Sequence, residues 1–378
     1  MPKHDHTRSA IVVGAGIVGI AMARALSQSG FHVTMVDRHT GQQGASVRNF
    51  GMVWLIGQAR GKVLELAQRG RTVWKELCEA TGTWYDPVGS LQLAYRPEEA
   101  AVLQEFHEQE KDLRPLRIIP TSGVSDQSPA VRTDGLLLAL HHADDLIVDP
   151  RSAIPNFTMW LKEKRGVEWV MGSTVTAVRD GVVHLGDGAR LQGDLIFVCP
   201  GADLSTLYPV ADDKELTLCK LQMMRMQAQP DGWRMGPALC GGLSLIHYAS
   251  FAETPSLGRL RDLYADEYPE HLRWGIHVMA SQNGAGEITI GDSHEYGPEP
   301  SPFNNERIDE LVWNHLSGFT RFPAPNITER WHGVYAKALG GQTHRLRKVD
   351  ANTFVLNGLG GAGMTLSFGL AEEICAKL

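Results

Sequence analysis

The sequence has few of the features that mark a secreted, membrane-spanning or nucleic-acid-binding protein. Its five cysteines are scattered and odd in number, which fits neither a disulfide framework nor a zinc-binding pattern. No apolar run reaches the ~18–20 residues that cross a bilayer, and the start, MPKHDHTRS, is too polar for a signal peptide. No run of five basic residues occurs, and the formal charge is -7. We therefore expect a cytoplasmic protein with no membrane span and no nucleic-acid partner.

Glycine, by contrast, is abundant. The chain has 378 residues, enough for two domains or one large one, and 40 of them are glycine. Three dense groups occur, within residues 14–19, 41–51 and 358–363, and each lies beside an apolar run. This placement is typical of tight turns at which the backbone approaches a ligand.

The first glycine group lies in a strand–turn–helix–strand pattern. Residues 9–13 are small and apolar and predict a buried strand, and residues 14–19 read Gly-Ala-Gly-Ile-Val-Gly. Residues 20–29 predict a helix, and residues 31–36 predict a second strand that ends at Asp37. This is the G-x-G-x-x-G arrangement of a dinucleotide-binding unit, although a purely structural turn is the alternative.

Each part of this motif has a physical role. Gly14 allows the tight turn, Gly16 lets a pyrophosphate approach the backbone, and Gly19 lets the helix pack on the strand. The helix N-terminus presents its positive end to the phosphates. Asp37 accepts hydrogen bonds from a ribose diol and would repel the 2′-phosphate of NADP, but it does not separate NAD from FAD.

Two further segments favour FAD. Residues 44–52 read Gly-Ala-Ser-Val-Arg-Asn-Phe-Gly-Met, and residues 355–365 read as a strand that enters a glycine-rich turn. A helix is expected from about residue 365 to 377, and its N-terminus is a second site for an anion or a carbonyl oxygen. A cofactor that contacts all three glycine groups must be long, which suits FAD better than NAD.

With these motifs the chain resembles the FAD-dependent amine oxidases related to D-amino acid, glycine and sarcosine oxidases. The resemblance covers nearly the whole chain and includes Asp144-Asp145, residues 148–150 and the predicted strand that leads to Gly201. It implies an α/β fold, in which a Rossmann-like FAD-binding domain of the glutathione-reductase type is joined to a β-rich α+β substrate domain. The expected boundaries are 1–84, 146–216 and 331–378 for the FAD-binding domain, and 85–145 and 217–330 for the substrate domain.

The resemblance implies that FAD is bound non-covalently, because the cysteine that attaches flavin in sarcosine oxidase is missing near residues 331–335. The 44–52 loop and the 360–365 turn would border the isoalloxazine ring, and Val175 would lie near the adenine. Without the resemblance, residues 46–49 would be interpreted as a polar surface loop. The predicted cofactor-binding residues are Gly14, Gly16, Ile17, Val18, Gly19, Asp37, Arg38, Gly44, Ala45, Ser46, Arg48, Asn49, Gly51, Met52, Val175, Gly201, Gly360, Gly361, Gly363, Met364 and Thr365.

The reaction that the resemblance implies is oxidation of a C–N bond in a small primary or secondary amine. The product imine hydrolyses to an aldehyde and an amine or ammonia, and oxygen becomes hydrogen peroxide. The cofactor carries the redox chemistry, while protein groups position the substrate. Thr289 replaces the lysine that sarcosine oxidases use toward oxygen, so a dehydrogenase with another acceptor stays open. A flavoprotein without catalytic activity is a remote alternative.

The substrate positions depart from the family pattern. Tyr335 stands where glycine and sarcosine oxidases carry an arginine for the substrate carboxylate, and Lys337 offers a point charge two residues later. His277 takes the place of a substrate-facing tyrosine. The loop at residues 45–54 resembles a subgroup linked to aminophosphonate breakdown. We therefore expect a small anionic amine, 2-aminoethylphosphonate or its N-methyl derivative, oxidised to phosphonoacetaldehyde; glycine, sarcosine or a D-amino acid is the alternative.

The predicted substrate-contacting residues are Arg48, His277, Tyr335, Lys337 and Arg345, and His344 is a further donor. Simpler interpretations stay open, because residues 344–348 also fit a solvated basic turn and His277 also fits a buried core histidine. The methionines near Cys219 have no spacing that suits a soft metal, so no metal site is predicted. The sequence leaves open whether the protein is a monomer or a homo-oligomer.

Overall fold

The predicted strand–turn–helix–strand unit forms the centre of a parallel sheet in the computed structural model, which describes residues 8–208 and 215–378. Strand β1, Ser9–Val13, is followed by helix α1, Ile17–Gln28, and strand β2, His32–Asp37. The order of this sheet is β20-β21-β13-β1-β2-β9, in which β20 alone among the six strands runs antiparallel to its neighbour. The remaining strands are β9 (Glu168–Met171), β13 (Leu195–Val198), β20 (Arg345–Lys348) and β21 (Thr353–Asn357).

Helices cover one face of this first sheet, and a small antiparallel sheet covers the other. The helices are α1, α2 (Lys62–Thr81), α5 (Pro150–Arg165) and α10 (Gly363–Cys375), and the small sheet contains β10 (Val175–Arg179), β11 (Val182–Leu185) and β12 (Arg190–Gln192). The side chains of β1 alternate between the two layers: Val12 packs with the helices and Ile11 with the small sheet. The aromatic rings of Trp74, Phe157 and Phe368 fill the helical layer.

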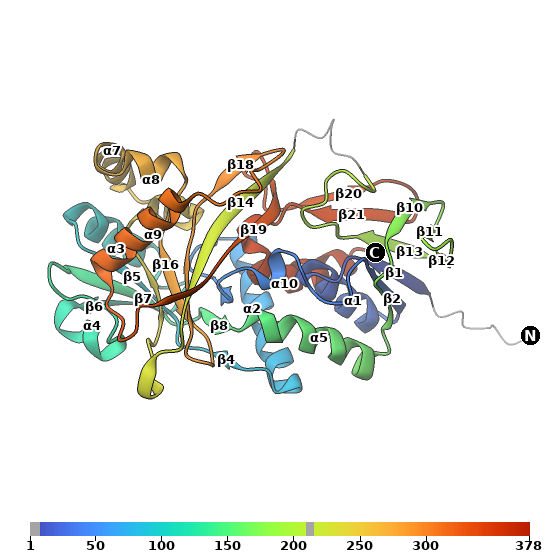
Figure 1. Ribbon diagram of the computed structural model, residues 1–378, viewed down its shortest axis with the longest axis horizontal. Helices are drawn as coiled ribbons and strands as arrows, with labels where there is room; N and C mark the ends of the chain where they lie inside the picture. The colour runs from blue at the N-terminus through green and yellow to red at the C-terminus, as the bar shows by residue number, and fades with distance from the viewer. Residues whose placement is uncertain (1–7, 209–214) are drawn as a thin grey trace, which may run out of the picture.

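A second, larger sheet of nine strands lies beside the first (Figure 1). Its order is β18-β14-β17-β16-β15-β5-β7-β6, and β19 pairs with β14. The strands are β5 (Ser90–Ala94), β6 (Leu116–Pro120), β7 (Leu138–His142), β14 (Leu216–Met226), β15 (Ala238–Cys240), β16 (Met279–Gln282), β17 (Ile288–Gly291), β18 (Glu295–Gly297) and β19 (Ile327–Ala338). The helices of this part are α3 (Pro97–Glu110), α4 (Thr121–Gln127), α6 (Leu243–His247), α7 (Leu257–Glu267), α8 (Pro269–Arg273) and α9 (Glu306–Phe319).

The fold therefore contains a Rossmann-like domain and a β-rich second domain, as the sequence predicts. A small sheet of β3 (Met52–Val53), β8 (Leu146–Val148) and β4 (Tyr85–Asp86) is the fourth set of paired strands. The long strand β19 was not recognised from the sequence. The domain boundaries given above stay predictions. In the part of the chain that the structure describes, no helix has the length and apolar character to cross a membrane.

Asp145, between β7 and β8, is a buried carboxylate that ties several segments together. Its Oδ1 accepts hydrogen bonds from the backbone N–H groups of Leu55 (2.5 Å) and Ile56 (3.1 Å). Its Oδ2 accepts from Ser90 Oγ at 2.6 Å and lies 2.8 Å from His142 Nδ1. A buried carboxylate needs such donors, because its desolvation is not otherwise compensated.

We expect the substitution Asp145→Ala to lower the free energy of unfolding by about 3–5 kcal/mol, because it leaves several buried donors without an acceptor. The neighbouring Asp144→Ala is the matched control. Asp144 is partly exposed and its side chain pairs only with Arg71, at 3.1 Å, so its loss should cost less than about 1 kcal/mol. Urea unfolding of both variants measures the difference. Equal effects of the two substitutions would show that Asp145 does not hold these segments.

Candidate active site

An elongated cavity of about 800 Å³ lies at the carboxyl ends of β1, β2 and β13 and extends to the second sheet. Ligands of open parallel sheets bind at this edge, because the strand ends and the helix N-termini meet there. Nearly all predicted cofactor-binding residues line the cavity: Gly14, Gly16, Ile17, Val18, Asp37, Arg38, Gly44, Ala45, Ser46, Arg48, Asn49, Met52, Val175, Gly201, Gly360, Gly361, Gly363, Met364 and Thr365.

Two predicted cofactor-binding residues, Gly19 and Gly51, do not line this cavity, and protein packing explains both. A Cβ atom on Gly19 would lie 1.8 Å from the carbonyl oxygen of Gly14, so only glycine lets α1 pack on the turn. A Cβ atom on Gly51 would lie 2.0 Å from the carbonyl oxygen of Val148, and its φ of +73° also favours glycine.

The glycine turn is held from both sides by side chains. Asp37 Oδ2 accepts a hydrogen bond from the backbone N–H of Ala15 at 2.7 Å, and Asp37 Oδ1 accepts from that of His39 at 2.8 Å. Ser46 Oγ accepts from the backbone N–H of Ile17, in the first turn of α1, at 2.9 Å. Asp37 and Ser46 therefore shape the glycine-turn end of the cavity as well as lining it.

The loop at residues 44–51 folds around Asn49. The side-chain Nδ2 of Asn49 donates to the carbonyl oxygens of Ala45 and Ser46, both at 3.0 Å, and its Oδ1 accepts from the backbone N–H of Gly51 at 2.8 Å. Arg48 Nη1 donates to the carbonyl oxygen of His332 at 3.2 Å, which connects this loop to β19. The polar residues of the loop are thus mostly engaged in holding it against the cavity.

A second helix N-terminus opens on the same cavity. Residues 360–365 form a short turn and then the start of α10, and they all line the cavity. A Cβ atom on Gly361 would meet only the Tyr335 side chain, at 3.5 Å from its hydroxyl oxygen, so bound atoms can approach the backbone there. Thr365 Oγ1 accepts from the backbone N–H of Trp54 at 2.8 Å, which fixes the start of the helix.

These features fit FAD. The N-cap residues of α1 and α10, Gly16 and Ala362, make no side-chain cap hydrogen bond, and the N-termini of both helices present positive dipole ends to the cavity. The glycine turn at α1 suits a pyrophosphate, and the start of α10 lies beside it, because a Cβ atom on Gly363 would lie 3.8 Å from Ile17 Cγ2.

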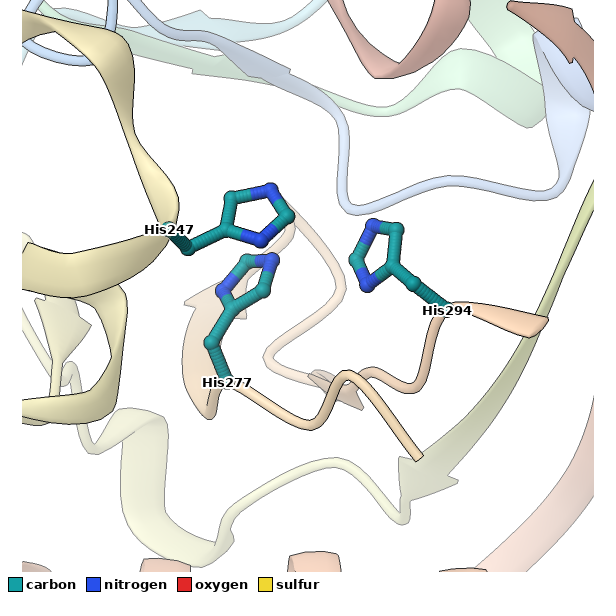
Figure 2. A group of neighbouring side chains, drawn as sticks. All are labelled: His247, His277 and His294. Atoms are coloured by element: carbon teal, nitrogen blue, oxygen red, sulfur yellow. The ribbon is translucent and has the colours of Figure 1, made fainter. Parts of the chain in front are cut away.

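The far end of the cavity contains three histidines, His247, His277 and His294 (Figure 2). His247 ends α6, His277 lies just before β16, and His294 lies just before β18. The ring centroids of His247 and His277 are 3.8 Å apart, and those of His247 and His294 are 4.6 Å apart. The sequence analysis had selected only His277, because no local spacing relates the three residues.

Burial makes this end of the cavity favour neutral side chains. It lowers the pKa of His277 well below the usual value, and that of His294 to about 4. Burial also raises the pKa of Asp292, whose Oδ1 lies 3.3 Å from His277 Nε2. The imidazoles of His277 and His294 are therefore uncharged at neutral pH. Lys337, whose Nζ donates to the Tyr296 hydroxyl at 3.0 Å, brings a positive charge to this end.

Four of the five predicted substrate-contacting residues line the cavity: Arg48, His277, Tyr335 and Lys337. Tyr335 and Lys337 are two positions apart on β19 and so face the same side of the strand. Burial raises the pKa of Tyr335 well above its usual value, so its hydroxyl keeps its proton. Arg345, on β20, does not line this cavity, and its Nε lies 2.6 Å from Glu215 Oε2. A role in substrate binding stays a prediction for all five.

Comparison with known proteins gives one family for nearly the whole chain. The family model described as "DAO: FAD dependent oxidoreductase" matches residues 9–377. The tRNA 5-methylaminomethyl-2-thiouridine biosynthesis bifunctional protein MnmC of Pseudomonas aeruginosa (strain UCBPP-PA14) is 27% identical over 249 residues, which are 63% of this chain and 36% of that protein. The N-methyl-L-tryptophan oxidase of Escherichia coli O139:H28 is 28% identical over 213 residues, 53% of this chain and 55% of that protein. The matches thus span about a third to a half of these relatives.

Solved structures show the same fold at low sequence identity. L-proline dehydrogenase from P. horikoshii matches with a TM-score of 0.76 at 18% sequence identity. The match covers 98% of this chain and 92% of that protein. Glycine oxidase from Bacillus cereus ATCC 14579 matches with a TM-score of 0.76 at 13% sequence identity. The match covers 98% of this chain and 94% of that protein.

We expect the substitution Gly14→Ala to weaken FAD binding at least about fivefold, since a strained residue costs roughly 1 kcal/mol or more. Gly14 has a φ of +105°, and a Cβ atom there would lie 2.3 Å from the carbonyl oxygen of Cys199. Gly258→Ala, in α7, is the control, because its Cβ atom would meet no described atom within 4 Å. Fluorescence titration of the FAD-free protein with FAD measures the affinity. An unchanged affinity in Gly14→Ala would contradict the assignment of this turn.

Proposed function

Because the chain belongs to the DAO family of FAD-dependent oxidoreductases, we propose that it oxidises the C–N bond of a small anionic amine. The observation that carries this proposal is the continuity of the cavity. It runs from the glycine turn at α1, past the N-terminus of α10, to a polar end beside His277, Tyr335 and Lys337. A substrate at that end lies next to the part of the cofactor that α10 and β19 border.

The preferred substrate in this proposal is 2-aminoethylphosphonate or its N-methyl derivative, which is oxidised to phosphonoacetaldehyde. Lys337 supplies a point charge, Tyr335 a protonated hydroxyl and the uncharged imidazoles N–H donors. Several separate donors suit the tetrahedral oxygens of a phosphonate, whereas a planar carboxylate favours the paired donors of an arginine. Glycine, sarcosine and D-amino acids are the alternative substrates.

FAD, when bound, supplies a two-electron acceptor for the hydride on the carbon next to the substrate nitrogen. The chain's own groups do the positioning. The α1 turn would hold the pyrophosphate, and the uncapped start of α10 would stabilise negative charge at the flavin ring. Apolar side chains of Leu221, Met223 and Met279 form part of the cavity wall and limit water near the reacting carbon. The uncharged imidazoles do not repel the amine as it loses its proton.

Oxygen is the proposed electron acceptor, with hydrogen peroxide as the product, and a different acceptor is the alternative. Thr289, which stands in place of the oxygen-associated lysine, is buried in β17 and does not line the cavity. The proposal places the protein in the cytoplasm, where its five free cysteines would stay reduced.

Loss of flavin absorption under anaerobic conditions tests the substrate directly. We expect the FAD-loaded protein to lose its visible flavin absorption fastest with 2-aminoethylphosphonate or its N-methyl derivative, compared with glycine, sarcosine and D-alanine. Subsequent exposure to air shows whether oxygen restores the absorption. If glycine or sarcosine reduces the flavin and neither aminophosphonate does, the proposed substrate is wrong. If the flavin stays reduced in air, the proposed acceptor is wrong.

The substitution Lys337→Met should raise the KM for the anionic amine by about tenfold or more, because a hydrogen bond to a charged group contributes roughly 1.5–3 kcal/mol. Arg345→Met is the matched comparison, because Arg345 also carries a positive charge but does not line the cavity. We expect its KM to stay within about twofold of the unsubstituted protein. Steady-state peroxide production measures both. A larger change in Arg345→Met than in Lys337→Met would reverse the assignment of the anion-binding residue.

A further inference from the structure

The three histidines at the substrate end of the cavity have the composition and proximity of a metal site. Each of His247, His277 and His294 offers one ring nitrogen, and these three nitrogens all lie within 4.8 Å of one another. Figure 2 shows the three imidazoles gathered around one space, on segments that come from different parts of the chain. A tetrahedral zinc site with ~2.0–2.1 Å bonds needs ligand nitrogens about 3.4 Å apart. Small side-chain rotations therefore suffice.

Neighbouring groups orient two of the rings as they do behind metal ligands. His294 Nδ1 lies 3.0 Å from the carbonyl oxygen of Gly275, so it carries the proton and leaves Nε2 with a free electron pair. His277 Nδ1 lies 3.4 Å from the Ser244 hydroxyl oxygen, which leaves Nε2, 3.3 Å from Asp292 Oδ1, as the nitrogen for a metal ion. His247 is exposed to the cavity, and its ring packs against those of His277 and His294 and makes no hydrogen bond to any described residue.

The surroundings also suit a cation. Asp292 Oδ1 is buried and accepts no hydrogen bond from the residues that the structure describes. A bound cation would give this oxygen a positive partner.

We propose that His247, His277 and His294 bind one divalent transition-metal ion of the zinc class, with the carboxyl group of Asp292 beside them. Three imidazole ligands leave an open coordination position, as in metal sites that bind a substrate. That position faces the cavity, where it would take an oxygen of the anionic group of the amine. This last step rests on the proposed function, whereas metal binding itself does not.

The test uses the full-length, FAD-loaded protein without a purification tag, freed of metal by a chelator and then dialysed against Zn²⁺. We expect one zinc ion per chain. His247→Ala should weaken zinc binding at least about tenfold and should fold, since the ring of His247 has no hydrogen bond to lose. His32→Ala, on the surface of β2, is the control and should bind zinc as the unsubstituted protein does.

Thermal unfolding gives a second readout, because an ion that binds only the folded state raises the Tm. Zinc should raise the Tm of the unsubstituted protein and of His32→Ala, but not that of His247→Ala. Absence of zinc binding, or equal binding in His247→Ala and His32→Ala, would overturn the metal site.

The same zinc-free and zinc-loaded samples, mixed anaerobically with the amines above, separate the two proposals. Flavin reduction by an amine in a protein that binds no zinc supports the proposed function and overturns the metal site. Zinc binding at the three histidines with no reduction by any amine overturns the proposed function and supports the metal site.

Discussion

The buried carboxylate of Asp145 is the interaction on which the geometry of the active-site wall depends. Its two oxygens meet donors from the segment after β3 and from the strands β5 and β7 of the second sheet. The segment it holds, Leu55-Ile56, lies between Trp54 and Gly57, both of which line the cavity. A buried carboxyl group is stable there because neighbouring donors are directed at it. The cofactor end and the substrate end of the cavity thereby keep a fixed relation.

Close approach of backbone to backbone sets the other end of the cavity. Gly19 lets α1 pack directly on the Gly14 turn, and Gly70 on α2 lets that helix approach α10, with a Cβ atom there only 2.3 Å from the Thr365 carbonyl oxygen. Because α1 and α10 are fixed in this way, their positive ends lie side by side on one cavity. Side chains such as Asp37 and Ser46 hold the glycine turn in place.

The substrate end has a different physical character. It combines neutral imidazoles, a protonated tyrosine hydroxyl and the single ammonium group of Lys337, all in an environment where burial opposes charge. An anionic group of the substrate, bound directly or through a metal ion, would balance the positive charge of Lys337. The same burial explains why Asp292 and His277 stay uncharged although they lie side by side.

The sequence by itself determined the cofactor-binding unit, because the spacing of Gly14, Gly16 and Asp37 encodes local turns and a helix start whose geometry does not depend on the rest of the chain. Family resemblance extended this to FAD and to the positions of His277 and Lys337. Only the tertiary structure brought His247 and His294 beside His277 and turned Arg345 toward Glu215. It also showed that Gly51 serves packing against Val148. Such contacts arise between strands and helices distant in the chain, and no local period in the sequence records them.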